Sequence, residues 1–384
     1  MTTQIEVHRM YKYRLYHTKR NKHLVNAIHI AGIIWNHSLA LCKRYYRVFG
    51  RGVDFNELMK HIAKLRNGRF AFWQKLGSQA VQEVIQRLKR AFERFFKKQG
   101  GFPKFKKVKT YPSFTLKQAG WKLLGKNKIR LLNHNYKFVK SREIEGEIKT
   151  VTVKRDSMGR LWVCFSVVQQ MMMPELSTGK RGGFDFGLKH FLTNDEGQHI
   201  ESPEFFRKAM TKIQALNRVL SSKQDGSNNR KRAKYRLAKA HDHIRNQRRD
   251  WFYKLAHHLC DAYGTLYFED LNLEGMKRLW GRKASDLAFA EFIAILNHVA
   301  SKRGCRVKQI DRWEPTTQCC SGCGHRQRLG LKDRTFQCEH CGMTLDRDHN
   351  AARNILRVGA STHDLEVVRR ASQTECTVPA RSLV

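Results

Sequence analysis

The stretch GFDFG, residues 183–187, decides the fold expected for the second half of the chain, because it sets one acid between two phenylalanines. The alternation predicts a β-strand, in which Asp185 points to the face opposite the two rings. Aspartate is depleted in strands, so an aspartate here needs a partner, and a divalent metal ion is the most economical one. The residues that follow predict a turn at 194–197 and a second strand ending near Ile200.

A second apolar strand, LYFED at residues 266–270, ends in two adjacent acids. Alternation allows only one of them to face the same side as Asp185, and we choose Glu269 because it closes the apolar run. Asp270 is then expected to cap or brace the turn that follows.

A third acid comes from DRDHNAA, residues 346–352. Asp348 starts a helix there, where a carboxylate also gains from free backbone N–H groups, and Asp346 is the competing candidate. Each acid alone would be a cap or a surface ion pair, so the hypothesis depends on the three together. Three carboxylates can hold two magnesium ions about 4 Å apart, an arrangement that hydrolyses phosphodiester bonds without a nucleophilic side chain.

The most specific local pattern is Cys320-x2-Cys323, then fourteen residues, then Cys338-x2-Cys341. Two CxxC turns place four thiolates about 2.3 Å from one ion, which is the closed shell of a structural zinc site. Cys319 is a conceivable substitute for Cys320, but its spacing to the next cysteine is looser. We therefore expect Cys319 to be unligated.

Charge identifies the class of partner. The 384 residues include 74 lysines and arginines against 33 acids, a net charge of +41. A folded chain this basic repels itself unless a polyanion neutralises it, so nucleic acid is the expected partner. A hydrophobic content of 41% excludes a disordered basic tail. The apolar stretch from Leu24 to Trp35 is interrupted by Asn26, His29 and Gly32, so we expect no membrane span, no signal peptide and a cytoplasmic protein.

The first half of the chain predicts a sheet with a helical insertion. Residues 5–16 alternate as a strand, and residues 21–96 have the apolar spacing of three or four helices. Residues 112–175 predict a β-rich unit, which the first strand should join because it has no other sheet. The ten lysines and arginines of residues 87–109 are interleaved with phenylalanines, which suits either phosphates and stacked bases or an amphipathic helix.

The second half predicts alternating helices and strands around the acids. The expected elements are helices at 203–222 and 229–262, a strand at 265–269, a helix capped by Ser285 and Asp286, a strand at 305–311 and a helix from Asp348. Residues 360–384 show no periodicity and predict a frayed tail.

These motifs together resemble the TnpB family, transposon-encoded RNA-guided DNA nucleases related to the compact type V CRISPR effectors. The resemblance spans nearly the whole chain. It is carried by YKYRLY, GGFPKF, GFDFGLKH, LYFEDLN, DRWEPTTQCCSGCG, the second CxxC and LDRDHNAARNIL. In the family pattern, the acids of a RuvC-like nuclease domain match Asp185, Glu269 and Asp348, which favours Asp348 over Asp346.

The resemblance implies an α+β multidomain fold, in which an oligonucleotide-binding-like β-barrel (WED) is interrupted by a helical recognition lobe (REC) and followed by an RNase H-like nuclease domain. The implied domains are WED at 1–20 and 99–178, REC at 21–98, RuvC at 179–317 and 344–360, an inserted zinc module at 318–343, and a disordered tail at 361–384.

The implied activity is magnesium-dependent DNA cleavage by two metal ions, next to a short flanking motif and directed by a transposon-derived guide RNA. The implied partners are a guide RNA and double-stranded target DNA. The implied location is the nucleoid, within the cytoplasm. Lys75, Gln79 and Gln82 on one helix are candidates for DNA contact, since glutamine can read adenine edges. The alternatives are a guided DNA-binding repressor without effective cleavage and a transposase that joins DNA ends. The sequence sets no oligomeric state.

Overall fold

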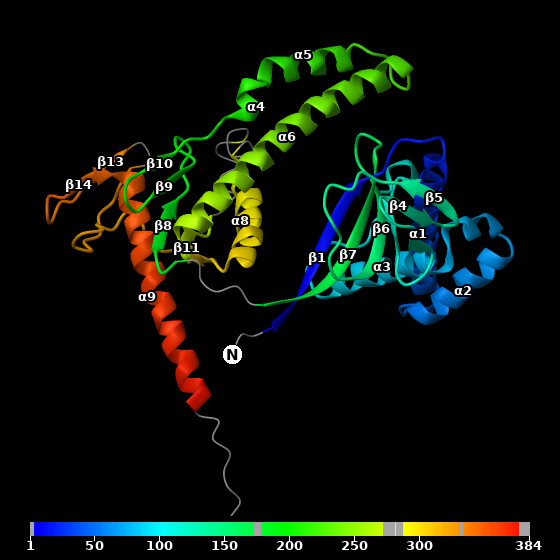
Figure 1. Cartoon of the computed structure of the whole chain (residues 1–384), viewed down its shortest axis with the longest axis horizontal. Helices are drawn as coiled ribbons and strands as arrows, with labels where there is room; N and C mark the ends of the chain where they lie inside the picture. Colours follow the sequence, from blue (N-terminus) through cyan, green and yellow to red (C-terminus); the bar gives the residue numbers. More distant parts are fainter. Residues whose placement is uncertain (1–3, 173–177, 272–280, 282–286, 331–332, 376–384) are drawn as a thin grey trace, which may run out of the picture. The chain divides into compact units, whose positions relative to one another are not determined.

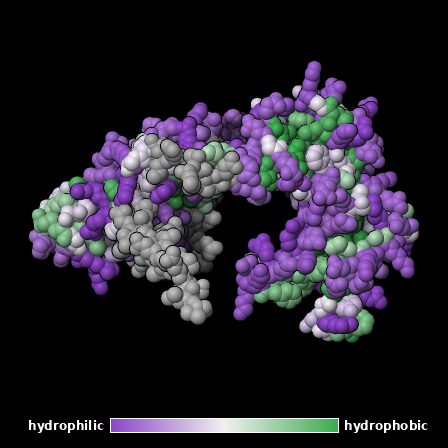
Figure 2. Space-filling model, turned by 60° about the horizontal axis from the view of Figure 1, so that its bottom comes forward, coloured by the Kyte–Doolittle hydropathy of each residue, from purple (hydrophilic) through white to green (hydrophobic). Residues whose placement is uncertain are grey.

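The computed structural model describes residues 4–172, 178–271, 281, 287–330 and 333–375. The chain forms two compact units, Met1–Met172 and Met173–Val384, each with its own sheet and core (Figure 1). Hydrophilic residues cover most of the face seen in Figure 2, with smaller hydrophobic patches between them.

The first unit is a β-structure with helices inserted after its first strand. Strand β1 (Gln4–Arg14) pairs antiparallel with β7 (Leu161–Met172), in register from Gln4 opposite Met172 to Arg14 opposite Trp162. This pairing confirms that the first strand joins the later sheet. Its order is β1-β7-β6-β2, with β6 at Glu147–Arg155 and β2 at Ser113–Leu116. A second sheet contains β3 (Trp121–Leu123), β4 (Lys128–Leu131) and β5 (His134–Lys137).

The inserted helices match the predicted number. They are α1 (Asn21–Phe49), α2 (Phe55–Asn67) and α3 (Ser78–Phe96), with short 3₁₀ turns η1 (Ala71–Leu76) and η2 (Val108–Thr110). Apolar residues from these helices and from the sheet form one continuous core, because each element buries the apolar side of its own periodicity.

Helix α1 contains the apolar stretch from Leu24 to Trp35, for which we expected no membrane span. Within the described residues it is long and apolar enough to cross a bilayer, with a mean hydropathy of 1.3 in its best window. More than half of that window (56%) is buried inside the protein, and residues such as Leu24, Ile28 and Ile34 are fully buried in the core of the first unit. Burial of this kind is typical of a core helix.

The second unit contains a five-stranded sheet of order β10-β9-β8-β11-β12. Strand β8 pairs antiparallel with β9 and parallel with β11, and β11 is parallel to β12. The strands are β8 (Arg181–Asp185), β9 (Leu192–Asn194), β10 (His199–Ile200), β11 (Thr265–Glu269) and β12 (Arg306–Ile310). The predicted turn is confirmed by the Gly197 N–H, which donates to the Asn194 carbonyl at 3.0 Å.

The second unit also contains helices. They are α4 (Phe205–Lys208), α5 (Met210–Ser221), α6 (Asn228–Ala262), α8 (Phe289–Arg303) and α9 (Arg347–Glu375); a small hairpin of β13 (Thr335–Gln337) and β14 (Thr344–Asp346) precedes α9. The predicted cap of α8 at Ser285 and Asp286 lies outside the described residues.

Helix α9 continues through residues 361–375, where the sequence predicted a disordered tail. The prediction was wrong for residues 361–375 because we took the lack of a regular apolar spacing to mean that no helix forms. A helix that is already nucleated adds each further residue at little cost, and no glycine or proline interrupts residues 361–375.

Strand alternation sorts the sheet into two faces. Phe184 and Phe268 belong to the core that β8 and β11 share with α6 and α8, whereas Tyr267 packs on the α9 side. A Cβ on Gly183 would lie 2.3 Å from the Ala352 carbonyl of α9, so only glycine allows this close approach. Helix α9 therefore lies directly over the face of β8 opposite Phe184.

Candidate functional site

The carboxyl ends of β8 and β11 meet at one edge of the sheet because the two strands are parallel. Asp185 ends β8 and is only 7% exposed. Burial raises its pKa well above the usual range, and the charges of Asp348 and Glu269 raise it further, while Arg347 opposes the shift. The structure thus brings the three predicted acids close enough to interact electrostatically.

Asp348 lies in the first turn of α9 and is 8% exposed. Its carboxylate approaches the loop after β8, where its Oδ2 would be 3.2 Å from a Cβ placed on Gly187. Asp346, the competing candidate, is occupied differently, since its Oδ1 accepts hydrogen bonds from the backbone N–H groups of Asp348 (2.9 Å) and His349 (3.3 Å). Asp346 therefore caps the helix that presents Asp348.

Glu269 ends β11 and is half-buried. Burial raises its pKa; a hydrogen bond with Thr316 opposes the shift, and the Asp270 charge adds to it. The Oδ2 of Asp270 accepts from Arg312 Nε at 3.0 Å and forms an ion pair with this residue of the segment after β12. The turn that Asp270 was predicted to cap or brace continues into residues 272–280, which lie outside the described residues. Of the two adjacent acids, Glu269 is the one without a cationic partner in the described part of the chain.

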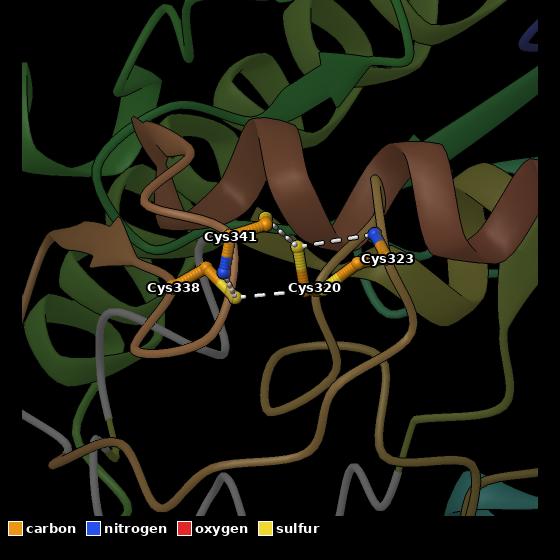
Figure 3. Close-up of side chains that lie close together, drawn as sticks. All are labelled: Cys320, Cys323, Cys338 and Cys341. Atoms are coloured by element: carbon orange, nitrogen blue, oxygen red, sulfur yellow. Dashed lines mark hydrogen bonds between the residues drawn. The ribbon is translucent and has the colours of Figure 1, made fainter.

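The four predicted cysteines form a compact cluster (Figure 3). Cys320 Sγ lies 3.7 Å from Cys341 Sγ, and Cys323 Sγ lies 3.6 Å from Cys338 Sγ. A tetrahedral shell with zinc about 2.3 Å from each sulfur has sulfurs roughly 3.8 Å apart, so the cluster can hold zinc without rearrangement. Burial alone would raise the pKa of Cys320, but backbone hydrogen bonds from Cys323 and Gly322, together with hydrogen bonds from the Cys323 and Cys338 thiols, lower the pKa to about 6.

Within the described residues, this cluster is the only group of three or more acids, histidines or cysteines whose ligand atoms all lie within 4.8 Å of one another. The carboxylates of Asp185, Glu269 and Asp348 do not meet this limit, so they are more widely spaced than the ligands of a single ion. Cys319 lies outside the cluster, and its carbonyl oxygen accepts hydrogen bonds from α9.

Two buried asparagines of α9, which the sequence analysis missed, join the cysteine cluster to the acids. Asn350 accepts from the Ser321 N–H (2.9 Å) and donates to the Cys319 carbonyl (2.8 Å). Asn354 donates to the carbonyls of Cys319 (2.7 Å) and Thr316 (2.8 Å). Their signal in the sequence is the spacing of four residues, which puts two amides on one helix face.

We expect Asn354→Ala to destabilise the second unit by about 1–3 kcal/mol, because the Thr316 carbonyl loses its side-chain donor and the Cys319 carbonyl keeps only the donor from Asn350. The matched control is Asn297→Ala, since the Asn297 amide is exposed and bonds only to its own helix at Ile293. Thermal unfolding of both variants checks the prediction. Equal melting temperatures for the two variants would contradict the role of Asn354.

The DNA-contact candidates do not share one helix as predicted. Lys75 lies in η1, whereas Gln79 and Gln82 lie in α3. Gly77, in the left-handed region with φ of 81°, separates the two elements. Lys75 and Gln82 are exposed, but Gln79 Oε1 accepts from the Ala119 N–H at 2.8 Å. The structure thus leaves two of the three side chains fully available.

Comparisons with known proteins agree with this fold. Residues 289–355 match the family described as "Cas12f1-like, TNB domain", and residues 163–279 match "Probable transposase" of the OrfB_IS605 type. A "Putative RNA-guided DNA endonuclease" of Streptomyces pristinaespiralis is 29% identical over 364 residues, covering 92% of this chain and 90% of the relative. TnpB-like protein L79 of Acanthamoeba polyphaga mimivirus is 33% identical over 55% of this chain and 43% of its own length.

Among solved structures, the chain resembles Cas12f1 in a complex with sgRNA and target DNA, with a TM-score of 0.56, 15% identity, and coverage of 91% of this chain and 98% of that one. The fold is therefore that of the compact Cas12f-type effectors, with mixed α/β sheets and a four-cysteine cluster. The matched family models and the named relatives support the resemblance of this chain to the TnpB family.

Proposed function

We propose that the protein is a transposon-encoded, RNA-guided DNA endonuclease that binds a transposon-derived guide RNA and cleaves target DNA beside a short flanking motif. The observation that carries this proposal is the buried carboxyl of Asp185 at the end of β8, whose pKa is raised by burial and then by the neighbouring Asp348 and Glu269. The name of the Streptomyces relative and the nucleic acids in the Cas12f1 complex support the choice of reaction and partners. The net charge of +41 suits a protein that holds a heteroduplex by its backbone.

The proposed catalytic residues are Asp185, Glu269 and Asp348, which would hold two magnesium ions. Bound magnesium supplies an activated water and stabilises the departing 3′-oxygen. The three carboxylates are too far apart to bind a single ion together, and this spacing suits a site in which they are shared between two ions. The chain's own contribution is placement, because parallel strands set two acids at one edge and α9, capped by Asp346, presents the third.

The proposed domains follow the observed elements. The sheet order β10-β9-β8-β11-β12 supports an RNase H-like RuvC domain at 179–317 and 344–360, with a zinc module at 318–343. A structural zinc would be held by Cys320, Cys323, Cys338 and Cys341. The antiparallel sheets of the first unit support a WED-like domain at 1–20 and 99–178, and helices α1 to α3 support a REC lobe at 21–98. Exposed Lys75 and Gln82 are proposed to contact the DNA flanking the target.

The test of guided recognition is sequencing of the RNA that co-purifies from a host carrying the native flanking DNA. We expect one abundant species that ends in a variable, target-like segment. Reprogramming that segment should redirect magnesium-dependent cleavage to a matching plasmid, which gel electrophoresis measures.

Other outcomes identify the alternatives. Target binding without nicking would indicate a guided repressor, and strand-transfer products would indicate a transposase. Heterogeneous RNA, or none, would contradict guided recognition. Association with the nucleoid, inside the cytoplasm, is part of the same proposal.

A further inference from the structure

The helical part of the first unit contains a pocket with a volume of about 790 Å³. Its walls come from α1, from the segment that starts α2, and from α3 with the loop after it. The aromatic residues that line it include Tyr46, Phe55, Phe92, Phe96 and Phe102. The pocket lies outside the unit that carries the acids and the cysteines, and the proposed reaction does not use it.

Three of the rings that line this pocket, those of Tyr46, Phe96 and Phe102, are exposed to solvent. Phe96 is 74% exposed, and Phe102 is 41% exposed. Phe92 anchors them, since its ring stacks on Phe96 with centroids 6.3 Å apart and meets Phe102 edge to face at 5.5 Å. Contiguous exposed apolar surface of this kind marks a binding site on a soluble protein.

The charges around the rings are positive. Lys43 and Arg47 line the pocket, and Lys43 Nζ lies 5.4 Å from the centre of the Phe102 ring and 5.0 Å from that of Phe105. Among the described residues that form the walls, none is acidic. An occupant that complements the pocket therefore has a flat apolar face and a negative charge, which are the features of a nucleotide. A second copy of this chain carries the same +41 charge and would be repelled.

We propose that this aromatic pocket binds an unstacked base of the guide RNA, with Lys43 and Arg47 contacting the adjoining phosphates. The inference rests on the proposed function, which supplies an RNA that stays bound. A permanent partner suits the pocket better than target DNA does, because target DNA would leave the rings exposed between encounters.

The test compares two fluorescent probes by anisotropy, a decamer of oligoadenylate RNA and a decamer with the same phosphates but abasic sugars. Wild-type protein should bind the adenylate probe more tightly. The double variant Phe96→Ala/Phe102→Ala should lose about 5- to 150-fold in affinity for that probe, the range expected for stacking one base, and nothing for the abasic probe. Lys43→Ala should weaken both probes and reduce the salt dependence.

The matched control is Phe72→Ala, since Phe72 is 46% exposed in the same unit but does not line the pocket. It should bind both probes like the wild type. Equal binding of the two probes by the wild type, or equal losses in the double variant and the control, would overturn the proposal. A concentration-dependent dimer that only the double variant dissociates, seen by sedimentation, would overturn it in favour of a protein interface.

Neither probe requires cleavage, so the two proposals fail separately. Base-dependent binding at the pocket without guided cleavage would contradict the endonuclease proposal alone. Guided cleavage that survives in the double variant, with unchanged binding of both probes, would contradict the pocket proposal alone.

Discussion

Asp185→Asn is expected to lower the rate of target cleavage by roughly a thousandfold or more, because the change removes a charged ligand from the proposed magnesium site and keeps the shape of the side chain. Binding of guide RNA and target should be unchanged, since Asp185 is buried and contributes no surface for nucleic acid. Single-turnover cleavage in magnesium, together with gel-shift assays, measures both quantities.

The matched control for this variant is Asp270→Asn. Asp270 is adjacent to the proposed ligand Glu269, but it forms an ion pair with Arg312 and has no proposed role in catalysis. The Asp270→Asn variant should cleave target DNA at a rate within a few fold of the wild-type rate. In EDTA, Asp185→Asn should be no less stable than the wild type, because it relieves crowding among three like charges. Normal cleavage by Asp185→Asn would remove this residue from the active site.

Cys338→Ser is expected to reduce the zinc content from about one ion per chain to near zero and to abolish cleavage. The loss of cleavage follows from the hydrogen bonds by which Asn350 and Asn354 hold the cysteine segment to α9, the helix that presents Asp348. Metal analysis by mass spectrometry and the same cleavage assay check the two effects.

Cys319→Ser is the control for the zinc prediction, because Cys319 precedes a proposed ligand and contributes only its backbone carbonyl to α9. Zinc content and cleavage should both stay at wild-type levels. If Cys319→Ser lost zinc as Cys338→Ser does, the ligand set would have to be revised. A zinc content that is unchanged in Cys338→Ser would refute the zinc site itself.

Local patterns predicted the strands and helices well, because period and turn residues act over a few positions. The strand joining in the first unit was predicted from the isolated alternation of residues 5–16, and β1 does pair with β7. The extent of α9 was not predictable in this way, since helix propagation needs no apolar period. Lys75 and Gln79 were predicted to share one helix because most residues around them favour a helix. Gly77 nevertheless ends one element there and the next begins after it.

For the site, the sequence by itself determined the residue types: two CxxC pairs at zinc spacing, and three acids that each stand at the end of a strand or the start of a helix. The tertiary structure supplied the physical reason for choosing between neighbouring acids. Asp346 caps α9 and Asp270 pairs with Arg312, which leaves Asp348 and Glu269 beside Asp185. The pairing of Asp270 with Arg312 and the approach of Asp348 to Gly187 depend on contacts between segments far apart in the chain, which no local pattern encodes.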